Sequence, residues 1–106
     1  MNELTFTNIF DAVTDDSGEA ADLEFRADMM LLLRNYFETQ DWSTADIMEA
    51  LDIPQPRVSE LLSGKVSKFS SDKLIKFLAK IGYQLKPSLT VEKDSSVSIT
   101  CDTKAV

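Results

Sequence analysis

The segment from Asp52 to Ser63 constrains the fold most, because it joins a sharp turn to a short one-sided helix. Aspartate tolerates the left-handed backbone conformation that such a turn needs. Pro56 suits the first turn of a helix, where a missing amide hydrogen costs little. The valine and leucine residues that follow fall on one side, so Gln55 and Arg57 stay free at the opening turn. The pattern is typical of a helix that buries one side and presents its N-terminal end to a partner.

Two further helices are predicted before this segment. Ser43, followed three residues later by Asp46, resembles a capping box, so a helix should start there and end near Leu51. Upstream, apolar residues recur at intervals of three and four, which predicts an amphipathic helix over about residues 19–40. Its apolar side must be buried against the other helices.

The chain after this segment predicts a fourth helix and then strands. Gly64 should end the third helix in the left-handed conformation, and Ser70 or Ser71 should cap a fourth helix that Gly82 stops. After Gly82 the apolar period changes to about two, which indicates one or two short strands. An isolated strand pair is marginal in water, so it either packs on the helices or pairs with its copy in a second subunit.

The charge is divided unevenly along the chain. The net charge of −7 argues at first against a nucleic-acid partner, because phosphate contacts need lysine and arginine. Residues 1–53, however, carry 13 acidic and two basic residues, a balance of −11, whereas residues 54–86 carry seven basic and two acidic, a balance of +5. Residues 87–106 add a balance of −1, from two basic and three acidic residues. The basic segment is the expected footprint of a phosphate-binding face, and chance clustering on a solvated surface is the alternative.

Several classes of protein are disfavoured by the composition. The chain has no histidine and a single cysteine, Cys101, which excludes thiolate–imidazole metal sites and removes the commonest general base. We therefore expect no enzyme, no metal and no cofactor. No run of about 18 apolar residues and no secretory signal is present, so we expect a cytoplasmic protein without a membrane contact.

Residues 42–65 resemble the helix-turn-helix of the XRE family, also called the Cro/C1-type repressors, and most of all the small HigA-like antitoxin regulators. Residues 19–23, 55–59 and 69–74 support the narrower match. The resemblance covers roughly residues 10–85. It implies a mainly α fold with a four- to five-helix Cro/C1-type domain and one or two short C-terminal β-strands.

Three regions are expected. Residues 1–18 form an acidic N-terminal arm or short docking helix, and residues 19–86 form the helix-turn-helix DNA-binding domain. Residues 87–106 form a C-terminal strand or tail, which is a candidate dimerisation element together with the fourth helix.

The resemblance implies that the helix from Gln55 lies in the major groove of DNA with its N-terminal residues on base edges. Gln55 suits adenine, and Arg57 suits guanine or a phosphate. Glu60 would accept a hydrogen bond from a cytosine amine, or it would repel phosphates and so reject wrong sequences. Ser59 is a weaker candidate. For each residue the alternative is an exposed polar side chain with no specific role.

Four further residues are predicted to contact phosphates. Ser43 and Thr44 lie at the start of one motif helix, where backbone amides favour anions. Lys65 and Lys68 lie beyond the third helix and carry the positive charge. The alternative for these residues, too, is an exposed side chain without a partner.

The expected function is a sequence-specific repressor of transcription that binds an inverted repeat of double-stranded DNA as a homodimer. The resemblance further implies the antitoxin of a HigBA/RelBE-like pair, whose toxin is a basic RNase of the RelE/HigB type. The acidic arm, with Phe6, Ile9 and Phe10, would bind this toxin by charge and apolar contact. The alternative is a stand-alone XRE-type or phage-derived regulator without a toxin partner.

Overall fold

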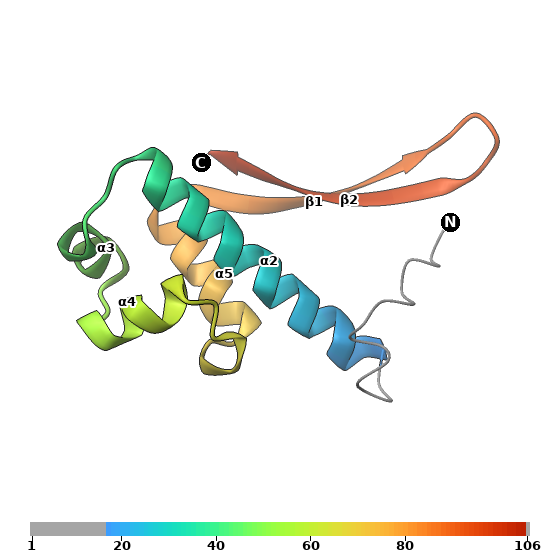
Figure 1. The fold of residues 1–106 in the computed structure, drawn as a ribbon. Helices are drawn as coiled ribbons and strands as arrows, with labels where there is room; N and C mark the ends of the chain where they lie inside the picture. The colour runs from blue at the N-terminus through green and yellow to red at the C-terminus, as the bar shows by residue number, and fades with distance from the viewer. Residues whose placement is uncertain (1–16, 106) are drawn as a thin grey trace.

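The computed structural model describes residues 17–105 of the 106-residue chain. The elements are, in order, α2 (Ser17–Thr39), α3 (Thr44–Leu51), α4 (Gln55–Leu62), the 3-10 helix η2 (Val66–Lys68), α5 (Ser71–Lys80), β1 (Tyr83–Val91) and β2 (Val97–Ala105) (Figure 1). The predicted mainly helical fold with short C-terminal strands is confirmed. The expected N-terminal arm lies outside the described residues, except for Ser17 and Gly18, which already belong to α2.

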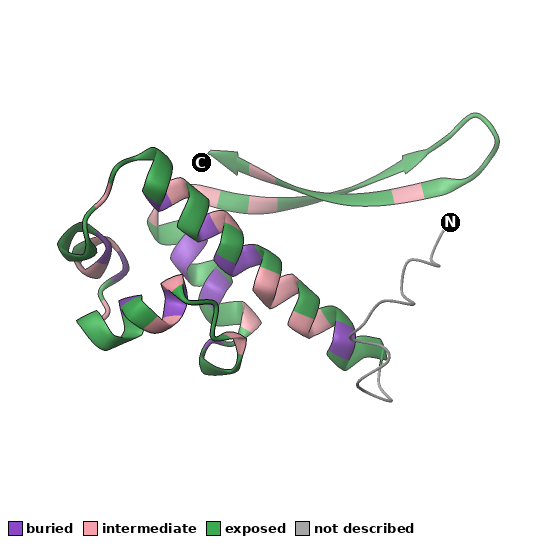
Figure 2. Cartoon of the chain, viewed as in Figure 1, coloured by how far each residue is buried: buried purple, intermediate pink, exposed green. Residues whose placement is uncertain are grey.

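The long helix α2 organises the helical body. It crosses α4, α5 and η2, and it contributes the buried side chains of Met29, Met30, Leu33 and Phe37 (Figure 2). Leu33 is 0% exposed, at the middle of the core. The shorter helices supply the rest of that core, which comprises Ile47, Leu51, Val58, Leu61, Phe69, Leu74, Phe77 and Leu78. The apolar stripe predicted from intervals of three and four is therefore the inner side of α2.

The predicted caps explain where two of the short helices begin. Ser43 Oγ accepts from the backbone N–H of Asp46 at 3.2 Å, and the Ser43 N–H donates to the Asp46 carboxylate at 2.9 Å. This confirms the capping box at the start of α3. Of the two serines proposed for α5, Ser70 is the cap and accepts from the Lys73 N–H at 3.4 Å. Ser71 is instead the first residue of the helix.

Strands β1 and β2 form an antiparallel hairpin that reaches away from the helices (Figure 1). Only its base is packed: the Tyr83 ring lies 5.6 Å from the Tyr36 ring of α2, and Leu85 is half-buried. Farther out, nearly all residues of both strands are exposed (Figure 2). The two strands predicted from the change of period thus pair with each other, and only the base of the pair packs on the helices.

Candidate nucleic-acid interface

A turn of three residues, Asp52 to Pro54, joins α3 to α4. Asp52 adopts the left-handed conformation, with φ 58° and ψ 53°, as the sequence predicts. The Nζ of Lys80, in α5, donates to the backbone oxygen of Leu51 at 2.9 Å. This contact satisfies one of the carbonyl groups that the end of α3 leaves open. The turn is therefore braced by a residue 29 positions farther along the chain.

The short helix α4 buries one side and exposes its opening turn. Val58 and Leu61 are each 1% exposed, whereas the side chains of Gln55 and Arg57 are exposed to solvent. Pro54 occupies the N-cap position without a side-chain hydrogen bond to the helix. The N-terminal end of α4 is thus open to a partner and carries two of the residues predicted to read bases.

Arg57 is held on one side of α4 by two contacts. Its Nη1 donates to Oε1 of Glu60 at 2.9 Å, and its guanidinium lies 5.4 Å from the centre of the Phe69 ring. Phe69 is 4% exposed, so Arg57 rests on a ring that is fixed in the core. The pair with Glu60 follows the three-residue spacing that brings helical side chains together. The two residues predicted as separate DNA contacts are therefore partners in the free protein.

A basic hollow lies between α4 and the start of α5. Arg57, Lys68 and Lys73 line it together with Asp52 and with Ser70, the N-cap of α5. The Nζ of Lys73 lies 5.6 Å from the centre of the Phe77 ring, which is also at this hollow. Lys73 was not among the predicted contacts, although it belongs to the basic segment. Three cations against one carboxylate leave an excess of positive charge at this hollow, which favours the binding of phosphate oxygens.

The other flank of α4 is polar and uncharged. Thr44, at the first position of α3, shares a hollow with Gln55 and Ser59. Ser43 precedes it and uses its hydroxyl oxygen to cap α3 through Asp46. The structure therefore brings Thr44, Gln55 and Ser59 together, while Ser43 lies at the edge of this group with a structural role of its own.

Carboxylates limit the basic region on the α3 side. Glu49 and Asp52 line a third hollow, beside Met48 and Pro54. Because carboxylates repel phosphates, a nucleic-acid backbone would be directed away from this hollow and toward Lys68 and the start of α5.

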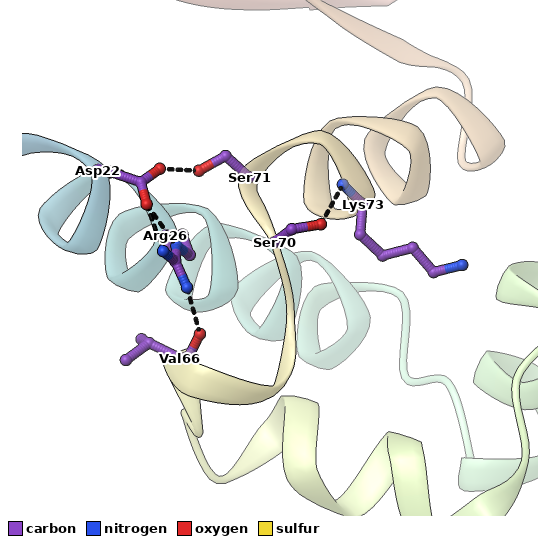
Figure 3. A network of polar contacts seen from close by, with 6 residues as sticks. All are labelled: Asp22, Arg26, Val66, Ser70, Ser71 and Lys73. Carbon is purple, nitrogen blue, oxygen red and sulfur yellow. Dashed lines mark hydrogen bonds and ion pairs between the residues drawn. The ribbon is translucent and has the colours of Figure 1, made fainter. Parts of the chain in front are cut away.

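Residues 65–68, which comprise Lys65 and the 3-10 helix η2, are held in place by side chains of α2 (Figure 3). Arg26 Nη1 donates to the backbone oxygen of Val66 at 3.1 Å. The same guanidinium pairs with Asp22, and the second carboxylate oxygen of Asp22 accepts from the Ser71 hydroxyl at the start of α5 (Figure 3). Arg26 and Val66 are 40 residues apart, and Asp22 and Ser71 are 49 apart. No local sequence pattern indicates contacts of this kind.

This network predicts a pH dependence of stability. Hydrogen bonds from Arg26 and then from Ser71 hold the pKa of Asp22 below its ordinary value of 3.8. Since the pKa is lower in the folded than in the unfolded chain, the ionised carboxylate stabilises the fold above pH 3.8, and this contribution disappears as the pH falls through the lowered pKa. We expect Asp22→Asn to unfold at a lower temperature than the wild type at pH 7. The difference between the two unfolding temperatures should disappear as the pH becomes acidic.

Thermal unfolding followed by circular dichroism at a series of pH values measures this difference. Asp28→Asn is the matched control, because Asp28 is an exposed acid on the same helix. A difference between Asp22→Asn and wild type that stays constant down to the most acidic pH would contradict the proposed role of the carboxylate charge.

The described residues contain no group of three or more histidine, cysteine or acidic side chains arranged to hold a metal ion. Among the helices between residues 17 and 105, none combines the length and apolar character needed to cross a membrane.

A family model described as a helix-turn-helix domain matches residues 12–88. This range contains α2, α3, α4, η2 and α5 and ends within β1, so β2 lies outside it. A comparison with curated proteins finds no match.

Proposed function

Because the chain belongs to the helix-turn-helix domain family, we propose that it is a sequence-specific repressor that reads double-stranded DNA with α4. The family is a DNA-binding one, and this chain is accordingly a DNA-binding protein. The observation that carries the finer proposal is the open first turn of α4, which lies between the basic hollow and the Thr44 side. We further propose that this protein is of the XRE type, because residues 42–65 resemble the helix-turn-helix of that family.

Gln55 and Arg57 are the proposed readers of base edges. Gln55 offers the donor and acceptor pair that adenine requires, and Arg57 offers two parallel donors to guanine. Ser59 lies on the same exposed side, one turn later. The ion pair between Arg57 and Glu60 supports a different role for Glu60, which engages the guanidinium in the free protein and repels misplaced phosphates.

Phosphate contacts are proposed on both flanks. Lys68 and Lys73 at the basic hollow supply charge, and Lys65 adds a further cation after α4. Thr44 and, at the edge of that flank, Ser43 supply hydroxyl donors near the start of α3. These contacts would fix the orientation of α4 in the groove without reading sequence.

A homodimer on an inverted repeat completes the proposal. Eight residues of α4 offer few base contacts, so tight binding needs two recognition helices, on half-sites about 34 Å apart. In this scheme residues 19–86 are the DNA-binding unit, and residues 87–106 belong to the dimerisation element.

Selection of bound duplexes from a random pool tests the regulator proposal directly. The expected result is an inverted repeat with two half-sites whose centres are one helical turn, or a multiple of it, apart. Recovery of duplexes without any common sequence would refute sequence-specific recognition. Binding that falls steeply with salt but is equal for all duplexes would indicate phosphate contacts alone.

The second part of the proposal is an antitoxin role toward a basic RNase of the RelE/HigB type. It is supported by the resemblance to HigA-like regulators and by the acidity of residues 1–53, which suits a basic partner. Residues 1–18, with their apolar Phe6, Ile9 and Phe10, are the proposed toxin-binding arm.

Co-expression with the product of a neighbouring toxin-sized reading frame tests this role. We expect the two proteins to purify together, and the complex to be lost when residues 1–16 are deleted, which leaves α2 intact from Ser17. An unchanged complex after the deletion would refute the assignment of the arm. DNA binding without any association with the neighbouring product would favour the stand-alone regulator.

A further inference from the structure

The outer half of the hairpin carries an exposed apolar face. Leu89 pairs with Ile99 and Val91 pairs with Val97 across the two strands. These four side chains are 61%, 73%, 64% and 55% exposed, respectively. Alternate residues of a strand point to the same face, so the two pairs form one continuous patch. A contiguous exposed patch of large apolar side chains is a candidate interaction site.

The same face carries no charge. Every second residue of each strand lies on this face. Besides Leu89 and Ile99, these residues are Tyr83, Leu85, Pro87, Val91, Val97, Cys101, Thr103 and Ala105. The charged residues of the strands, Lys86, Asp102 and Lys104, occupy the opposite face, and the other three lie in the turn at residues 92–94. Residues 83–105 contain three basic and three acidic residues, so the hairpin has no net charge, and the whole balance of −7 lies elsewhere in the chain.

We infer that a second copy of this chain covers the patch, with the two hairpins packed face to face. The inference rests on the proposed homodimer and names its surface. Two copies that each carry −7 repel one another, but the neutral hairpin lets them meet without opposed like charges. A strongly acidic or basic partner finds no complementary charge on this face. Face-to-face sheets about 10 Å apart bury such apolar pairs, which a lone hairpin leaves in water.

The position of the hairpin suits a dimer that binds DNA. In Figure 1 the hairpin lies on one side of α2, and α4 lies on the other. The patch lies on the face whose base, at Tyr83 and Leu85, packs on the helices, so a second hairpin approaches from the α2 side, and α4 lies beyond α2. The family match ends at residue 88, so the outer hairpin is a feature of this chain beyond the matched domain.

Leu89→Lys and Thr90→Lys form a matched pair for the test, because these neighbouring exposed residues point to opposite faces of β1. Sedimentation of the full chain should show a dimer for the wild type and for Thr90→Lys. For Leu89→Lys the dimer dissociation constant should rise at least about tenfold, because each subunit then places a charge in the apolar contact. Circular dichroism of both variants checks that the helical body is retained.

A dimer that Leu89→Lys does not weaken would overturn the inference, and so would a wild-type monomer at micromolar concentrations. Deletion of residues 1–16 identifies one alternative occupant: a wild-type monomer that becomes a dimer after the deletion would mean that this segment of the chain covers the patch. A wild-type monomer would also refute the proposed homodimer, whereas none of these results would contradict sequence-specific DNA binding by α4.

Binding to a single half-site separates this inference from the proposed function. Leu89→Lys should keep the wild-type sequence preference on a half-site duplex and lose cooperative binding to the inverted repeat. A wild type that dimerises through the hairpin but shows no sequence preference on either duplex would refute the repressor proposal alone.

Discussion

Replacement of Arg57 by alanine should weaken binding to the selected duplex by about 1–3 kcal/mol per half-site, or roughly 5- to 150-fold. The expected loss is that of a guanidinium that donates to both acceptors on the major-groove edge of one guanine. The sequence preference should relax at one base-pair position in each half-site. Fluorescence anisotropy with the selected duplex and its single-position variants measures both effects. Equal weakening across all duplexes would mean that Arg57 holds only phosphate.

Glu60→Gln is the matched variant for this experiment, because it keeps the size of the side chain and removes its charge. Glu60 pairs with Arg57 at 2.9 Å in the free protein, and a complex with guanine must replace that contact. We expect Glu60→Gln to bind at least as tightly as wild type, since one carboxylate leaves the interface and Arg57 loses a competing partner. A loss of preference at a cytosine would instead make Glu60 a base reader.

Phe77→Ala should lower the free energy of unfolding by about 3–5 kcal/mol, because Phe77 is 1% exposed and its removal leaves a cavity in the core. The total free energy of unfolding of a small domain is only about 5–15 kcal/mol, so this loss is a large fraction of it. Phe77 also packs edge-on against Phe69, the ring under Arg57, at a centroid distance of 5.9 Å. Urea denaturation followed by far-ultraviolet circular dichroism gives the stability change.

Ile75→Ala provides the control on the same helix. Ile75 is 42% exposed, so its truncation should cost no more than about 1 kcal/mol. A loss as large as that of Phe77→Ala would contradict the assignment of the two residues to the outer and inner sides of α5.

The helix boundaries were predictable because local chemistry sets them. Ser43 and Asp46 cap each other within one turn, and this reciprocal bond needs no tertiary contact. Asp52 takes the left-handed conformation because the chain must turn between two helices whose apolar sides face one core. Gly64 and Gly82 take positive φ values of 76° and 92° after α4 and α5 for a related reason. The exposure of Gln55 likewise follows from the one-sided pattern of α4.

The local environment of the predicted readers was not predictable in the same way. Phe69 reads as an ordinary apolar loop residue, and only the fold, in which α4 and the start of α5 line one hollow, places its ring under Arg57. Lys73 joins the basic hollow because the start of α5 approaches α4, which no spacing in the sequence indicates. The charge balance of each segment of the sequence located the basic region. The fold decided which of the cations in that region share one surface.

By itself, then, the sequence determined the helices, their caps, the turn at Asp52 and the polarity of α4, since these depend on residues within one or two turns of each other. Only the tertiary structure decided that Lys80 closes α3, that Asp22 and Arg26 hold residues 65–68, and that the helices of the same chain leave the apolar face of the outer hairpin uncovered. Contacts between residues 29 to 49 positions apart depend on how the helices cross, and burial depends on which faces find a partner. An alternating pattern predicts an apolar face on a strand, but it does not say what covers that face.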